Sequence, residues 1–262
     1  MGSKRLIFGA ASLTLFLGLV VNLPAAQLQG WLSSEGDPVV LYRVSGTFRE
    51  GSASALDWGP MRLNNPEWRL NPWALLRGCI SHDITANGDL GPLELTIERG
   101  LTGRLTISNA RGNLPLDALI KAARIPAPPM QGALQMDIQE LQMAGNQLRH
   151  IEGSLVARGL TWSLLRPPLL LGNYEILLSS DDDGMRADIA DKSAELEVKG
   201  QATLADDGAY QLDLRLRPAE TADNRIDNLL RPLGAPEGGG WYRIRQNGSI
   251  APPSSPTAPP PS

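Results

Sequence analysis

The sequence predicts a mainly β fold: an antiparallel curved sheet or open barrel-like domain with a few short helices, preceded by one N-terminal transmembrane helix. Three observations predict it. Short runs of alternating apolar and polar residues begin at Val39 and are broken by turn residues about every eight to twelve positions. No long amphipathic pattern interrupts them, and residues 6–23 form an uncharged apolar stretch.

The apolar stretch is expected to be a membrane anchor, with residues 1–5 as a cytoplasmic stub. As a helix, residues 6–23 would reach about 27 Å, close to the roughly 30 Å of bilayer hydrocarbon. Lys4 and Arg5 precede it, so the positive-inside tendency places the N-terminus in the cytoplasm. A cleaved signal peptide is the alternative, but Pro24 stands where cleavage requires a small residue. We favour retention in a bacterial inner membrane, with the following domain in the periplasm.

Residues 24–250 are expected to form this β-rich periplasmic domain. Strict alternation at residues 93–98, 134–139 and 212–217 places one face of each strand on a core and the other in water. Strands that follow one another in the chain should pair as neighbours. Tight hairpin turns are expected at Asn87-Gly88, Asp183-Gly184, Asp207-Gly208 and Asn247-Gly248.

Three short helices are expected between the strands, as covers over an open edge or barrel end. Asn71 and Pro72 supply a cap and a first residue for one of them. The others span residues 116–123 and 223–230. Residues 251–262 are rich in Pro, Ser and Ala and should form a disordered tail.

Charge and cysteine content exclude several classes of function. The 24 basic and 28 acidic residues give a net charge of −4 and are spread along the chain, so nucleic acid is not an expected partner. Cys79 is the only cysteine, so no intrachain disulfide can form. We expect it to be a small buried apolar residue.

No catalytic or metal-binding constellation is evident, and we expect neither an enzyme nor a cofactor. Asp181, Asp182 and Asp183 are interpreted as a solvated turn, because no EF-hand spacing follows them. His82 and His150 lie outside metal-ligand spacing, and His82 is expected at the surface.

The six tryptophans are the most informative side chains. Trp31 follows the apolar stretch closely and is expected at the membrane interface. Trp58, Trp68 and Trp73 are crowded into a short span, where they line an apolar groove or pack the first hairpins. We favour packing, and keep these three as possible contacts for a partner or an apolar ligand.

Ordered fragments along the chain resemble one protein family. The fragments are VSGTF from Val44, GSA from Gly51, WRLNPWALL from Trp68, DGAYQL from Asp207 and GWYRI from Gly240. Their order and spacing are similar to those of protein N of the bacterial type II (general) secretion system. The resemblance covers nearly the whole chain except the Pro-rich tail.

The resemblance implies a non-enzymatic, single-pass inner-membrane subunit of the machine that exports folded proteins across the outer membrane. It implies contacts with other subunits: the inner-membrane platform, the connecting protein C and the outer-membrane secretin. The alternative is an AsmA-like periplasmic module that binds or shields a lipid or another apolar ligand, which rests on fold-level analogy.

Overall fold

The structure is a computed structural model that describes residue 25 and residues 39–58, 61–122, 129–145, 147–181 and 184–249. The expected anchor, Trp31 and the Pro-rich tail lie outside these residues. Among the residues described, no helix has both the length and the apolar character needed to cross a membrane. The chain divides into two compact units, Met1–Ala127 and Pro128–Ser262.

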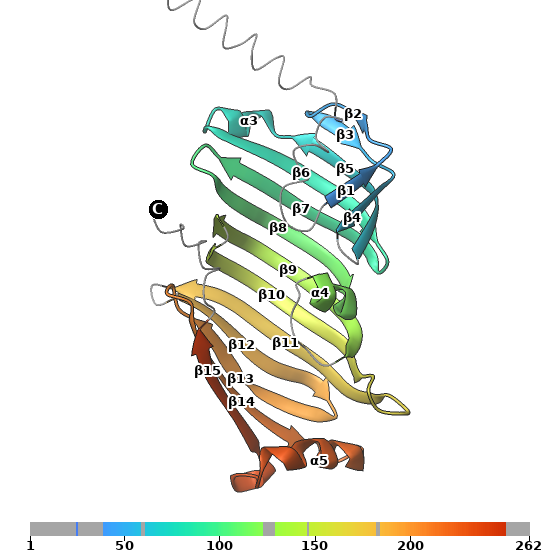
Figure 1. Cartoon of the computed structure of the whole chain (residues 1–262), viewed down its shortest axis with the longest axis vertical. Coiled ribbons are helices and arrows are strands. Elements are labelled where there is room, and N and C mark those ends of the chain that lie inside the picture. The colour runs from blue at the N-terminus through green and yellow to red at the C-terminus, as the bar shows by residue number, and fades with distance from the viewer. Residues whose placement is uncertain are drawn as a thin grey trace, which may run out of the picture. The chain divides into compact units, whose positions relative to one another are not determined.

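The first unit is an antiparallel sheet (Figure 1). Its strands follow the order β1-β4-β5-β6-β7-β8, and β3 pairs with β5 and with β2. Most strands therefore pair with their chain neighbour, as predicted. The elements are β1 (Val39–Tyr42), β2 (Ser45–Gly46), β3 (Glu50–Ser52), β4 (Ala55–Trp58), β5 (Met61–Leu70), α3 (Pro72–Leu75), β6 (Cys79–Gly88), β7 (Gly91–Gly100), β8 (Arg104–Pro115) and α4 (Leu116–Ala122).

The second unit is an antiparallel sheet in which every strand from β9 to β15 pairs with its chain neighbour. Figure 1 shows α5 across one end of this sheet. The elements are β9 (Met130–Ala144), β10 (Gln147–Trp162), β11 (Leu169–Asp181), β12 (Gly184–Ala194), β13 (Leu196–Leu204), β14 (Ala209–Pro218), α5 (Asn224–Leu230), η2 (Arg231–Leu233), η3 (Gly238–Gly240) and β15 (Tyr242–Ser249).

Strand register gives the first unit one apolar and one polar face. Ile84 lies between Trp68 and Leu95 across three strands, and all three side chains are partly buried. On the opposite face the Thr96 hydroxyl donates a hydrogen bond to Asp83, at 2.8 Å. The predicted alternation of residues 93–98 is thus confirmed.

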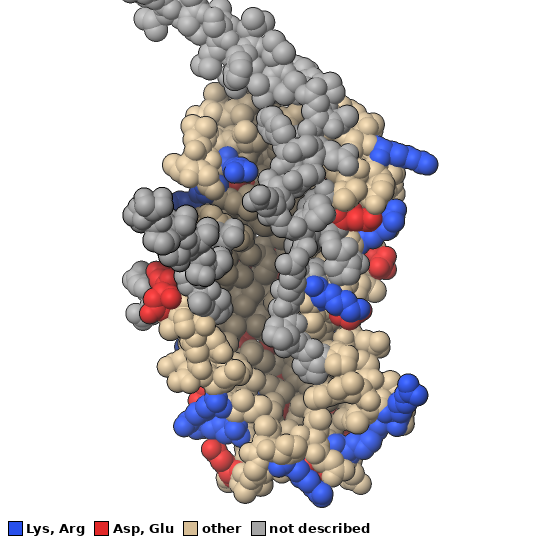
Figure 2. Space-filling view, in the orientation of Figure 1, with Lys and Arg blue, Asp and Glu red and all other residues tan. Residues whose placement is uncertain are grey.

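The second unit repeats this division. Ile176 of β11 pairs with Ile189 of β12 on the apolar face. On the polar face Arg217 forms an ion pair with Glu197, and Arg243 donates hydrogen bonds to Asp213. Figure 2 shows most charged side chains at the outline of the visible surface. Each sheet therefore presents a partly buried apolar face and a charged face.

The three predicted helices are present. The Asn71 side chain accepts a hydrogen bond from the backbone N–H of Trp73, which caps α3 as expected. Asp223 caps α5 in the same way. Ile226 and Leu230 of α5 are fully buried, and the guanidinium of Arg225 donates to the Pro167 carbonyl at 2.7 Å. The α5 helix thus closes one end of the second sheet.

Two predicted hairpin turns are wrong. Asn247 and Gly248 lie within β15 and pair with Gln211 and Tyr210 of β14. A Cβ on Gly248 would lie 2.7 Å from the Tyr210 ring, so this glycine provides space for an aromatic ring instead of a turn. Asn87 and Gly88 are the last paired residues of β6, and the turn is made by Asp89 and Leu90.

The turn at Asp207 and Gly208 is confirmed. Asp182 and Asp183 lie outside the described residues. The turn predicted at Asp183 and Gly184, and the solvated turn expected for the three aspartates, therefore remain predictions.

Candidate interaction surfaces

Trp68 is a packing residue in the first unit. Its indole N–H donates to the Thr47 carbonyl at 3.1 Å, and the ring lies so close to Gly51 that a Cβ there would collide with it. Thr47 lies in the turn between β2 and β3, and Gly51 lies in β3. The indole therefore holds the β2–β3 hairpin on β5, which agrees with the interpretation that we favoured from the sequence.

Trp73 is placed differently. It lies on α3 and its side chain is 73% exposed, so it contributes little to the core. Trp58 ends β4 and pairs through its backbone with Met61, at the opposite end of β5 from Leu70 and α3. The side chain of Trp58 lies outside the described part of the structure. The sheet thus separates Trp58 from the other two along its length, and does not gather three tryptophans into one groove.

Two further expectations are corrected. His82 is half-buried rather than at the surface: its Nε2 lies 3.0 Å from the Phe48 carbonyl, and its ring packs edge-on against Phe48 at a centroid distance of 4.8 Å. Burial lowers the pKa of His82 below its ordinary value. Cys79 is only partly buried, beside Arg77 and Glu98, because it lies in the first position of β6 at the sheet end.

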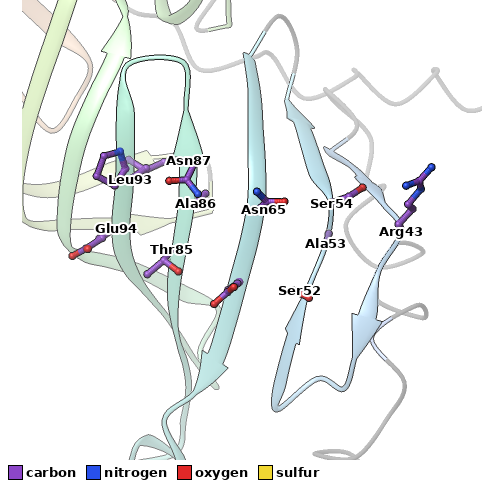
Figure 3. A pocket seen from close by; sticks show the side chains of 12 residues that line it. Arg43, Ser52, Ala53, Ser54, Asn65, Thr85, Ala86, Asn87, Leu93 and Glu94 are labelled. Atoms are coloured by element: carbon purple, nitrogen blue, oxygen red, sulfur yellow. The ribbon is translucent and has the colours of Figure 1, made fainter.

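A polar hollow of about 550 Å³ lies in the first unit (Figure 3). Glu67, Thr85 and Glu94 contribute to its lining from three neighbouring strands. Arg43 and Glu94 stand on opposite sides of it in Figure 3, and no histidine lines it. The lining side chains do not bring a nucleophile, a base and an orienting group together. Within the described residues, no group of three or more His, Cys, Asp or Glu side chains is arranged to hold a metal ion.

The apolar faces of the two sheets are one candidate surface. In the second unit Leu155, Ile176 and Ile189 are aligned across β10, β11 and β12, and each remains partly accessible. A sheet in a two-layer sandwich would have such residues fully buried. These three side chains are therefore partly available for further contacts.

The edge strand β15 is a second candidate surface. Among the described residues it pairs only with β14, and its last five residues are exposed. Arg243 holds the pKa of Asp213 below its usual range through its hydrogen bonds, and Arg245 lies 3.5 Å from the same carboxylate. Counting only the residues that the structure describes, one side of β15 therefore has backbone groups without a strand partner, beside the basic side chain of Arg245.

Comparison with known proteins gives this geometry a family context. Residues 37–245 match the family model of type II secretion system (T2SS) protein N, which covers both units. The chain belongs to the type II secretion system protein N family.

Two relatives of this family are similar along nearly their full length. Type II secretion system protein N of Aeromonas hydrophila is 26% identical over 252 residues, which cover 94% of this chain and 99% of the relative. Type II secretion system protein N of Vibrio cholerae is 27% identical over 249 residues, with coverage of 91% and 96%. No solved structure matches the chain. The family resemblance stated from the sequence is confirmed.

Proposed function

We propose that this protein is a non-enzymatic inner-membrane subunit of the type II secretion system, which supports the assembly or function of the machine that exports folded proteins across the outer membrane. One observation carries the proposal: the family match extends over residues 37–245, and so includes every strand from β1 to β14 and the first half of β15. Residues 6–23 would anchor the chain, and residues 24–250 would work in the periplasm.

A gene deletion tests the role. Loss of the protein should impair release of folded exoproteins and leave their export into the periplasm intact, so that they accumulate there. Restoring the full-length gene should restore release. Normal release from the deletion strain would contradict the proposal.

The β15 edge is our candidate contact for other subunits, which include the inner-membrane platform, protein C and the secretin. A photo-crosslinking amino acid at Asn247, which is exposed on the edge, should capture a secretion subunit in cells. The matched control is Ser179, which is exposed on β11 inside the sheet and should capture none. Equal capture at Asn247 and Ser179 would argue against the β15 edge as the contact surface for other subunits.

The partly accessible apolar faces favour a second candidate function, the shielding of a lipid or another apolar ligand. This function predicts that lipid copurifies with the protein and is lost when Leu95 is replaced by Gln, because Leu95 belongs to the apolar face. The control Thr96→Gln changes the polar face of the same strand. Mass spectrometry of extracted lipid distinguishes the two variants, and absence of lipid from the unaltered protein would exclude this function.

A further inference from the structure

One end of the first sheet carries three exposed, large apolar side chains. They are Trp73 (73% exposed), Leu76 (79%) and Leu101 (90%), which together we call the apolar tip. Trp73 and Leu76 are three residues apart at α3, a spacing that puts side chains on the same side of a helical turn. Leu101 lies in the turn between β7 and β8, and its methyl carbon is 3.4 Å from the position that a Cβ on Gly78 would occupy. Leu101 thus lies beside the residues that follow α3, at the same end of the sheet as Trp73 and Leu76.

Such a patch is costly in water. Soluble surfaces rarely group a tryptophan and two leucines at this exposure unless the group meets another surface. Neither leucine contributes to the core, and Leu101 occupies a turn where polar residues are the usual choice. Folding alone therefore does not explain these side chains.

Positive charge surrounds the tip. Arg49, Arg99 and Arg104 are exposed at the same end of the sheet, and no carboxylate of the described residues forms an ion pair with them. The acidic residues close by are engaged: Glu98 pairs with Arg77 and Glu50 pairs with Arg69. An apolar group with Trp and Leu, flanked by arginines, has the chemistry of a segment that enters the headgroup region of an anionic bilayer.

The tip is within reach of a membrane. Residues 24–38 join the expected anchor to β1, and 15 extended residues can span at most about 50 Å. The start of β1 aligns with Met61, and from there to the α3 end of β5 the sheet measures about 30 Å. The maximal reach of residues 24–38 therefore exceeds the distance that this segment has to bridge.

We infer that the apolar tip docks the first unit on the surface of the anionic phospholipid bilayer in which the chain is anchored. This inference rests on the proposed anchor. Trp73, Leu76 and Leu101 enter the interface, and Arg49, Arg99 and Arg104 face lipid phosphates. Docking fixes the orientation of the first unit relative to the membrane.

A fluorescent probe at a single cysteine tests the inference on the full-length protein. In a Cys79→Ser background, an environment-sensitive fluorophore is attached at Leu101→Cys, or at Leu90→Cys as the control. Leu90 is a turn leucine too, 43% exposed, at the opposite end of the same strands. Each protein is reconstituted in vesicles of phosphatidylcholine and phosphatidylglycerol. Flotation of the protein together with the vesicles shows whether the anchor holds it in the bilayer.

We expect both proteins to float, and only the Leu101 probe to show a blue-shifted emission and quenching by spin-labelled lipid. The shift should shrink in vesicles of phosphatidylcholine alone, in 1 M salt (where the Debye length is about 3 Å), and on replacement of Trp73 and Leu76 by Ser. If both proteins float but the probes at positions 101 and 90 respond alike, the docking is overturned and the anchor stands. Failure to float overturns both. Shielding of the Leu101 probe only in native membranes that contain other secretion subunits also overturns docking on lipid, and assigns the tip to a protein partner.

Discussion

Tyr174 links β11 to β13 in the second unit. Its hydroxyl lies 2.9 Å from the carbonyl of Leu171 and 2.8 Å from that of Leu196, and its ring is buried. Tyr174 belongs to β11 and Leu196 to β13, so the hydroxyl reaches across β12. Burial raises the pKa of Tyr174, which means that the phenol remains protonated and able to donate at any physiological pH.

We expect Tyr174→Phe to lower the free energy of unfolding by about 1–3 kcal/mol, because it removes the hydroxyl that donates a hydrogen bond to a buried carbonyl oxygen. Tyr210→Phe is the control, since the Tyr210 hydroxyl accepts a hydrogen bond from Gln246 at an exposed position. Its effect should stay within about 0.5 kcal/mol. Urea denaturation monitored by circular dichroism measures the unfolding free energy of each variant. Equal losses in the two variants would contradict the role of the Tyr174 hydroxyl.

His82 should make the stability of the first unit depend on pH. Burial lowers its pKa in the folded state below the unfolded value of 6.5, so the unfolded chain binds the proton more tightly. The stability contribution is complete above about pH 6.5 and is lost as the pH falls below that value. The paired aspartates, such as Asp213, have pKa values lowered from 3.8 and act only in a more acidic range.

Unfolding measured between pH 7 and pH 5 should therefore show a loss of stability that His82→Gln abolishes. The control variant His150→Gln should still lose stability between pH 7 and pH 5. An unchanged pH dependence in the His82 variant would show that the edge-on packing against Phe48 does not control it.

At the scale of single residues, the sequence was a partial guide. Packing was the favoured interpretation for the crowded tryptophans, and for Trp68 the structure supplies the Thr47 carbonyl that accepts a hydrogen bond from its indole N–H. The half-burial of His82 was not predictable, because it depends on Phe48, which lies 34 residues away in the chain. The exposure of Leu101 had a local signal: an apolar residue stands between Gly100 and Gly103, where a turn is expected.

The element whose packing is clearest is α5. Its capped start and the following Pro232 predict a short helix, and two of its side chains, Ile226 and Leu230, are fully buried against the rest of the second unit. An isolated helix of this length is unstable in water, so tertiary packing maintains it.

Ile226→Ala should therefore cost about 2–5 kcal/mol in unfolding free energy, through lost burial and a residual cavity. Leu233→Ala, in the 3₁₀ turn after α5, is the matched control because Leu233 is exposed. Thermal unfolding should show a lower midpoint for the Ile226 variant alone. A shift of similar size in both variants would mean that α5 is not the packed closure described above.

Helices and strand runs were predictable for a physical reason, whereas some turns were not. Asn71 and Asp223 act through local hydrogen bonds, and strict alternation reports one-sided burial directly. Glycine has two uses, however. Gly248 lies within β15, where the ring of Tyr210 from the neighbouring strand β14 occupies the space that a side chain would need. These residues are 38 positions apart, so the dipeptide Asn-Gly does not reveal the contact.

For the whole molecule, the proposed topology makes a direct prediction. Lys4 and Arg5 on one flank of residues 6–23 should keep the N-terminus in the cytoplasm. An alkaline phosphatase fused after residue 250 should then be active, and a cytoplasm-dependent reporter at the same position should be inactive. The reverse pattern would contradict the placement of the domain and of its partners.

The mainly β class, the antiparallel pairing and the short helices were all predictable from the sequence of the whole chain. The division into two compact units was not, because the same alternation continues on both sides of Ala127 and Pro128. The family assignment came from ordered fragments distributed over both units, and the match to residues 37–245 confirmed it.

The pairing of nearly every strand with the strand just before it has a consequence for biogenesis. A chain that crosses the inner membrane in an unfolded state emerges from its N-terminal side, and each new strand finds its template already in place. From β9 to β15, no strand has to wait for a distant one. Such local pairing lowers the entropic cost of closing each loop and favours rapid folding. In the proposed topology, the sheets can therefore grow hairpin by hairpin as the chain emerges, which shortens the time that unpaired edges are exposed to aggregation or proteolysis.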